Sequence, residues 1–155
     1  MKKISGLVVA IYVCFTAAFI GSVVTRVSVK TWYQTLKKPA WNPPDWIFAP
    51  VWSTLFLLMA ISIWLIWLKR EEHKIEKQIT LFSIQLITNI LWSTLFFGMQ
   101  NPDLAFVGII VLIIAIIATM VAFLEINKTA GYLMIPYILW VIFAAFLNVT
   151  ICWLN

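Results

Sequence analysis

Five long runs of apolar residues, separated by polar segments, dominate the pattern of this sequence. Each run has the roughly 20 residues that a helix needs to cross a bilayer core about 30 Å thick. A helix closes its backbone hydrogen bonds within the segment, as a lipid environment requires. The pattern predicts transmembrane helices over about residues 4–24, 47–68, 79–98, 104–124 and 131–154. We interpret the first run as a retained helix and not as a cleaved signal peptide, because it is long enough to span.

Three of the connections between these helices are short. Residues 69–78 form a charged hairpin, residues 100–103 a tight turn, and residues 125–130 the last connection. In the tight turn we expect Pro102 to end one helix and Asp103 to cap the next. Short connections make neighbouring helices antiparallel. The sequence therefore predicts an all-α fold, an up-down bundle that forms a single membrane domain over residues 1–155.

The first connection, residues 25–46, is long and rich in rings. It contains three of the four prolines that lie between residues 39 and 50, together with Trp32, Tyr33, Trp41 and Trp46. Loops of this length in compact proteins are usually functional or disordered, and disordered segments are poor in aromatic residues. One interpretation is an aromatic belt at the membrane surface. We favour the other, a stiffened lid over one end of the bundle.

The composition agrees with a membrane protein. Of the 155 residues, 63% are hydrophobic and 11% charged, whereas soluble proteins have about 25% charged residues. The net charge of +5 does not indicate nucleic-acid binding, because the basic residues are confined to the polar segments. Seven Lys and Arg lie on the side of the N-terminus and four on the side of the long loop. The positive-inside rule therefore predicts an N-terminus inside.

The predicted helix cores contain no Asp, Glu, Lys, Arg or His. Ion-coupled carriers and general acid–base enzymes need ionisable groups in the membrane or in a pocket, so both classes are disfavoured. Cys14, Cys152 and the single histidine, His73, are too few and too far apart in sequence to predict a metal site or a disulfide framework. We expect neither a metal nor a cofactor.

Three predicted helices each carry an aromatic stripe at helical spacing, two of them with uncharged polar groups. The stripes are Trp52, Phe56 and Met59; Gln85, Asn89, Trp92 and Phe96; and Tyr137, Trp140, Ala144 and Asn148. Such residues often serve only for packing and for hydrogen bonds between helices. If they line one cavity, it is apolar, flat-walled and uncharged. A large planar hydrophobic molecule would suit such a cavity.

Three ordered motifs resemble the translocator protein family, also called the TspO/MBR or peripheral benzodiazepine receptor family, and its prokaryotic members in particular. They are Trp41-Asn42-Pro43-Pro44 with Phe48 and Pro50-Val51-Trp52; Gln85-Leu86, Asn89, Trp92-Ser93 and Phe96-Phe97; and Pro136-Tyr137, Trp140, Phe143-Ala144 and Leu147-Asn148. The resemblance implies a five-helix bundle whose lidded pocket binds porphyrins and benzodiazepine-type ligands. The implied ligand-binding residues are Tyr33, Trp41, Pro43, Trp52, Phe56, Asn89, Trp92, Trp140, Ala144, Leu147 and Asn148.

Three functions stay open at this point. The first is binding of a porphyrin or similar planar molecule, for transport or sensing. The second is light-dependent porphyrin degradation, with Trp52 and Trp140 as redox-active indoles, and the third is a structural or assembly role without a small ligand. The resemblance also implies a homodimer, for which pairs of small residues offer surfaces: Ala17 with Gly21, and Ala118 with Ala122. The cholesterol motif of animal members is missing from residues 147–155.

Overall fold

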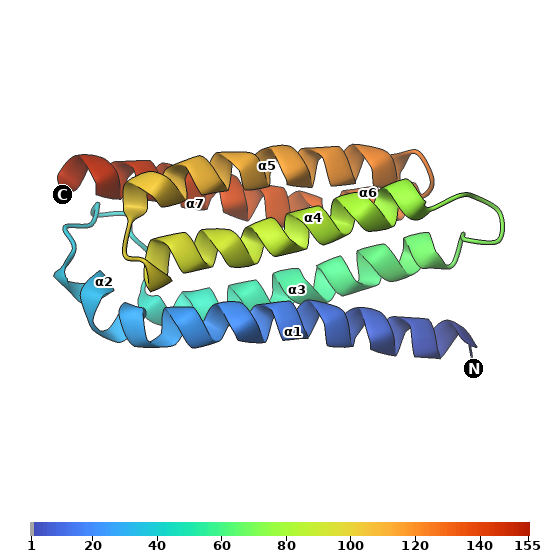
Figure 1. Ribbon diagram of the computed structural model, residues 1–155, viewed down its shortest axis with the longest axis horizontal. Coiled ribbons are helices and arrows are strands. Elements are labelled where there is room, and N and C mark those ends of the chain that lie inside the picture. The colour runs from blue at the N-terminus through green and yellow to red at the C-terminus, as the bar shows by residue number, and fades with distance from the viewer. Residues whose placement is uncertain (1) are drawn as a thin grey trace.

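The computed structural model describes residues 2–155, and its helices run side by side along one long axis (Figure 1). Within these residues every regular element is helical, which confirms the all-α prediction. The long helices are α1 (Lys2–Lys30), α3 (Asp45–Trp67), α4 (Glu76–Ser93), α5 (Pro102–Leu124) and α7 (Ile135–Leu154). The shorter elements are α2 (Trp32–Thr35), the π-helix η1 (Thr94–Gly98) and α6 (Lys128–Tyr132).

Five helical segments are long and apolar enough to cross a membrane, as predicted. Their outer faces carry many exposed large apolar side chains, among them Val8, Tyr12, Val107, Ile114 and Phe146. In water such a surface would cost free energy, whereas lipid chains cover it without cost. The exposed apolar belt and the helix lengths together establish an integral membrane protein.

The first helix is longer than predicted and the lid correspondingly shorter. α1 continues to Lys30, and the one-turn helix α2 follows it, so that only residues 36–44 of the lid are irregular. Basic residues at a helix end can extend their charge to the membrane surface, so Arg26 and Lys30 do not end the helix. Ser28 fixes the extension, because its hydroxyl donates to the carbonyl of Phe97 at 2.6 Å.

The turn at residues 100–103 corrects a second expectation. Asn101, and not Asp103, caps α5: its side-chain oxygen accepts from the backbone N–H of Leu104 at 3.0 Å. Pro102 is the first residue of α5, where its fixed φ suits the helix and its missing N–H costs nothing. Gln100 adopts a positive φ of 52°, which completes the reversal of the chain.

The last predicted helix is divided in two. α6 and α7 are separated by Leu133 and Met134, and the side chain of Asn127 caps α6 by accepting from the N–H of Ala130 at 3.1 Å. Ser62 of α3 donates to the carbonyl of Ala130 at 2.6 Å. The buried carbonyl of Ala130 therefore has a hydrogen-bond partner although the helix is interrupted after it.

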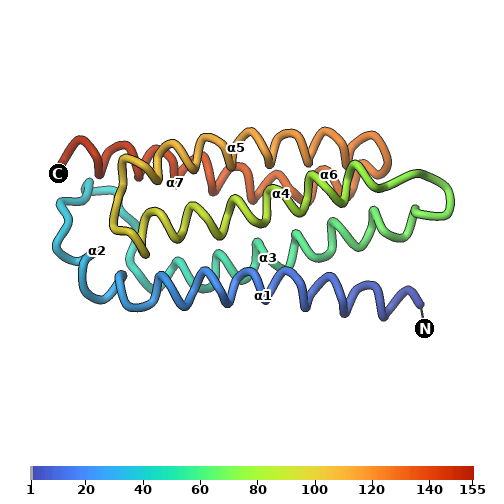
Figure 2. The backbone as a smooth tube through the Cα atoms, in the orientation of Figure 1, coloured from blue at the N-terminus to red at the C-terminus, as the bar shows by residue number. Residues whose placement is uncertain are grey.

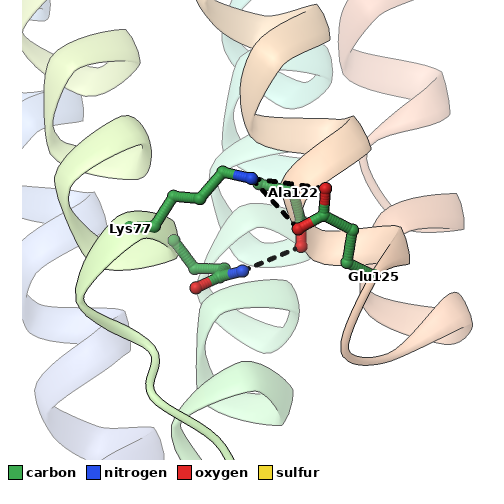
Figure 3. Close-up of polar contacts among 4 residues, drawn as sticks. Lys77, Ala122 and Glu125 are labelled. Atoms are coloured by element: carbon green, nitrogen blue, oxygen red, sulfur yellow. Dashed lines mark hydrogen bonds and ion pairs between the residues drawn. The ribbon is translucent and has the colours of Figure 1, made fainter.

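The loops separate into two groups at opposite ends of the bundle. The N-terminal end of α1, the α3–α4 connection and the α5–α6 turn lie at one end, whereas α2, the η1–α5 turn and the C-terminus lie at the other (Figures 1 and 2). At the first end Lys77 and Glu125 form an ion pair of 3.1 Å between α4 and the end of α5 (Figure 3). Beside it, Gln78 donates to the carbonyl of Ala122 at 3.1 Å.

The small-residue faces pack inside the subunit. Ala17 is buried, and a Cβ added to Gly21 would lie 3.7 Å from the hydroxyl of Ser93, so this face of α1 lies against α4. Ala122 of α5 is also buried, next to α4. Packing within the monomer therefore accounts for Ala17 and Ala122, whereas Gly21 and Ala118 are half-buried.

The grouping of the loops makes the membrane orientation testable. We expect a cysteine placed at Ala40, in the lid, to react with an impermeant thiol reagent from outside intact cells, and one placed at His73 to react only after lysis. Cys14 and Cys152 would be replaced by alanine in both variants. Labelling of position 73 in intact cells would reverse the orientation that the charge bias predicts.

Candidate aromatic ligand site

Aromatic side chains from α3, α4 and α7 meet between these helices. The ring centre of Trp52 lies 6.3 Å from that of Trp92 and 6.3 Å from that of Tyr137. Phe56, one turn along α3, lies 5.9 Å from Trp52. The three stripes that the sequence pattern predicts thus converge. The backbones of α3 and α7 come close at few points, so that rings bridge much of the space between them.

A second aromatic group joins α7 to the start of α3 and to the lid. Trp140 lies 6.2 Å from Phe48 and 5.4 Å from Phe143, and Trp41 of the lid lies 5.8 Å from Phe143. Phe48 and Phe143 were not among the predicted ligand-binding residues. Helical spacing could have predicted both residues, because Phe48 lies four residues before Trp52 and Phe143 three residues after Trp140, on the same helix faces.

The π-helix η1 connects the first group to α2. Phe96 of η1 lies 6.0 Å from Trp92, 6.3 Å from Tyr33 and 5.6 Å from Trp32. π-helical turns are rare and occur frequently at functional sites, because they change the direction in which side chains point. Here the turn places Phe96 between the buried Tyr33 and the aromatic group.

The polar groups of the site are uncharged and nearly all paired. Asn89 donates to the hydroxyl of Tyr137 at 2.8 Å. Asn148 accepts from the indole N–H of Trp92 at 3.3 Å and donates to the carbonyl of Pro102 at 2.8 Å. Asn148 therefore connects α7 to α4 and to the start of α5. Both asparagines are buried, so each hydrogen bond replaces one that water would have made.

Gln85, one turn before Asn89, is fully buried below the site. Its amide nitrogen approaches the sulfur of Met59 at 3.7 Å, and its carbonyl oxygen has no hydrogen-bond partner among the described residues. Within residues 2–155 no group of three His, Cys, Asp or Glu side chains could hold a metal. The groups that this site presents to a ligand are therefore aromatic rings and side-chain amides.

The remaining predicted residues surround these groups. Leu147 is buried on α7, Ala144 is half-buried one turn after Trp140, and Pro43 is half-buried in the lid. Trp41 is 48% exposed and covers Phe143 from outside. The structure therefore brings the predicted residues into one region, in two adjoining aromatic groups with Tyr33 at the edge.

Hydrogen bonds fasten the lid at two places. The hydroxyl of Tyr33 donates to the side-chain oxygen of Asn42 at 2.8 Å, and the ammonium of Lys38 donates to the carbonyl of Tyr33 at 2.7 Å. The side chain of Asn155 pairs with both backbone groups of Lys37 at 3.0 Å, which ties the lid to the end of α7. Burial raises the pKa of Tyr33 to about 12, and the Asp45 carboxylate adds to the shift. The phenol therefore stays a proton donor at neutral pH.

The sequence of the whole chain agrees with the three motifs. The family model described as "TspO/MBR family" matches residues 10–154. This chain belongs to the TspO/MBR family. The match includes all five membrane-spanning segments and the lid, so the membership extends over the entire site.

Relatives from distant organisms are similar over most of their length. The chain is 43% identical to the "Tryptophan-rich protein TspO" of Chlorobaculum tepidum, over 99% of this chain and 98% of the relative. It is 41% identical to the protein of the same name from Archaeoglobus fulgidus, over 96% of each chain. It is 36% identical to the "Translocator protein" of Ovis aries, over 84% of this chain and 78% of the relative.

The position of Asn148 predicts a structural cost for its loss. Asn148→Leu would leave the indole N–H of Trp92 without a partner and would remove the side-chain bond to the carbonyl of Pro102, which keeps its backbone partner inside α5. An unpaired buried polar group costs about 1–3 kcal/mol, so we expect a fall of about that size in the free energy of unfolding, measured by denaturant titration in detergent micelles. Thr150→Val, on the same helix, removes only a hydroxyl bonded to its own helix at the carbonyl of Phe146. An equal fall in the free energy of unfolding in both variants would show that the hydrogen bonds of Asn148 do not contribute to stability.

Proposed function

We propose that this protein binds a porphyrin or a similar planar hydrophobic molecule between α3, α4 and α7. The observation that supports this most directly is the convergence of Trp52, Trp92 and Tyr137 from three helices that share an uncharged interior. Flat rings on several sides match a flat conjugated ligand. The absence of charge in the helix cores suits a neutral macrocycle better than an ion.

The ligand would enter from the lid end and replace contacts between rings. Trp52 and Trp140 are only half-buried, so their indoles can turn without opening the tightly packed centre. A planar ring would then lie against Trp52 and Trp140, with Ala144 leaving room for its edge. Polar substituents of the ligand would stay near the lid, where Lys37 is exposed and Lys38 is already bonded to Tyr33.

The expected affinity is modest. A tetrapyrrole enclosed by rings removes several hundred Å² from water, worth about 5–10 kcal/mol at about 25 cal/mol per Å². Loss of rigid-body freedom and ordering of the lid offset much of this gain, and the bilayer competes as an apolar solvent. A dissociation constant of about 1 μM results, as an order of magnitude.

The names of the relatives indicate the wider role. One is named "Tryptophan-rich sensory protein", from Cereibacter sphaeroides, and others "Translocator protein". We propose that the present protein, like them, serves in sensing or transport, and that ligand binding is the step common to both. We also propose that it forms a homodimer in a bacterial cell membrane, as the family resemblance implies.

Filling the site provides the decisive test of ligand binding. Ala144→Phe adds a phenyl ring where the ligand edge would lie, so we expect at least a tenfold loss of protoporphyrin binding, which corresponds to about 1.4 kcal/mol. Binding would be measured by porphyrin absorbance and tryptophan quenching in micelles. Ile142→Phe is the control, because Ile142 lies on the same helix and is 36% exposed. Unchanged binding in Ala144→Phe would place the ligand elsewhere, and no saturable binding to the parent protein would leave a structural role.

The aromatic groups also favour a second candidate function, light-dependent degradation of the bound porphyrin. Indoles are readily oxidised, and the ring centres of Trp52 and Trp92 lie 6.3 Å apart. This pair of indoles could therefore donate an electron to a photoexcited ligand. We expect Trp140→Phe to retain porphyrin binding and to slow the loss of porphyrin absorbance under illumination. Equal rates of loss in the parent and the variant, or no loss beyond that of free porphyrin, would exclude this function for Trp140.

A further inference from the structure

Two adjoining hollows lie at the end of the bundle opposite α2, far from the aromatic groups. One is an apolar groove of about 400 Å³ between α1, α3 and α4, lined mainly by apolar side chains such as Val9, Val13 and Phe82. The other, of about 560 Å³, lies at the α3–α4 connection and is lined by charged side chains such as Arg70, Lys74 and Glu76. Trp67 and Ile79 line both, so the apolar groove and the polar hollow lie on either side of a shared wall.

Two indoles hold the walls of the groove in place. Gly6 lets the indole of Trp67 lie against α1, because a Cβ at this position would come within 2.5 Å of the ring. Trp64 donates its indole N–H to the carbonyl of Lys3 at 2.8 Å. The groove is therefore defined by packed aromatic rings between α1 and α3.

The position of the hollows selects an amphipathic occupant. The groove lies along membrane-spanning helices and opens toward lipid, since Val9 on its wall is 61% exposed. The polar hollow lies in the connection beyond the spans, at the height where lipid headgroups begin. A molecule that fills both needs an apolar chain at one end and a polar group at the other.

The charges around the polar hollow favour a negative headgroup. The hollow itself is lined by two basic side chains, Arg70 and Lys74, and by three Glu, of which Glu71 and Glu72 are ion-paired with Arg70 and Lys69. Lys2, Lys3 and Lys69 of the neighbouring segments make the balance over residues 2–3 and 69–76 five Lys and Arg against three Glu. Arg70 lies over the ring of Trp67 at 3.5 Å from its centre and donates to the Trp67 carbonyl at 3.1 Å. Its ion pair with Glu71 spans 3.5 Å, and the Glu71 side chain is 84% exposed, so water screens that attraction. Lys74 forms no ion pair within residues 2–155.

We propose that this site binds one anionic phospholipid of the surrounding membrane. One acyl chain occupies the groove between α1, α3 and α4, and the phosphate lies against Arg70 and Lys74. Basic pockets between membrane helices bind acidic headgroups, and each basic side chain near the surface contributes roughly a fivefold gain in affinity. The site is thus a lipid anchor at the end of the bundle that carries most of the basic residues, separate from the porphyrin site.

Native mass spectrometry of the purified protein, titrated with phosphatidylglycerol or phosphatidylcholine of identical chains, tests both halves of the proposal. We expect the first equivalent of phosphatidylglycerol to bind about 25-fold more tightly than phosphatidylcholine, on the scale of two basic contacts. In the double variant Arg70→Gln/Lys74→Gln this preference should fall to about twofold. Lys128→Gln is the charge control, because Lys128 lies at the same end but lines neither hollow.

A matched pair of variants tests the groove. Val9 and Val8 are neighbours on α1 and are 61% and 59% exposed, but only Val9 lines the groove. Val9→Phe should therefore weaken binding of the first lipid several-fold, and Val8→Phe should leave it unchanged. Unfolding temperatures in detergent would establish that each variant is folded. Equal affinity for both lipids in the parent protein, or equal effects of Val9→Phe and Val8→Phe, would overturn the proposal.

Discussion

The lack of water in the bilayer core is the constraint on which the rest of this structure depends. It favours a partner within the protein for nearly every buried polar group, with the carbonyl oxygen of Gln85 as an exception, because an unpaired group there costs several kcal/mol. Long helices meet this demand for most of the backbone. Where the helical pattern is interrupted, side chains complete it: Ser62 bonds the carbonyl of Ala130 at the α6–α7 break, and Asn101 accepts from the N–H of Leu104 at the start of α5.

The same constraint shapes the aromatic site. Charged groups are absent from the helix cores, so recognition there depends on ring faces and on neutral donors and acceptors. Asn89 and Asn148 are committed to Tyr137, Trp92 and Pro102, and therefore hold the rings in place more than they offer free bonds to a ligand. Trp52 and Trp140 are only half-buried. The site thus combines a hydrogen-bonded centre with two less buried indoles at its side.

The two ends of the molecule differ in chemistry and, by our proposals, in task. The lid end combines prolines and rings with the bonds of Tyr33 and Asn155, and it controls access to the aromatic groups. The opposite end carries most of the basic residues, and there Trp67 separates an apolar groove from a charged hollow. Binding of a lipid at one end and a porphyrin at the other would place two ligands on the same pair of helices, α3 and α4.

The sequence by itself determined the membrane class, the number of spans and the faces that carry Trp52, Asn89 and Trp140, because apolar length and helical period are local properties. It did not determine how helices begin and end. The extension of α1 to Lys30 and the break at Met134 involve partners far along the chain, such as the carbonyl of Phe97 for Ser28 and Ser62 for the carbonyl of Ala130, whereas the cap at Asn101 is a local bond from the N–H of Leu104.

Only the tertiary structure decided which side chains meet. Helical spacing places Phe48 and Phe143 on faces of α3 and α7, but their joining through Trp140 requires these helices to face each other. In the same way, the small residue Gly21 permits close approach to any helix, and the bundle places it next to Ser93 of α4. A sequence pattern fixes the direction of a side chain on its own helix, whereas its neighbour is set by how all five helices share one limited interior.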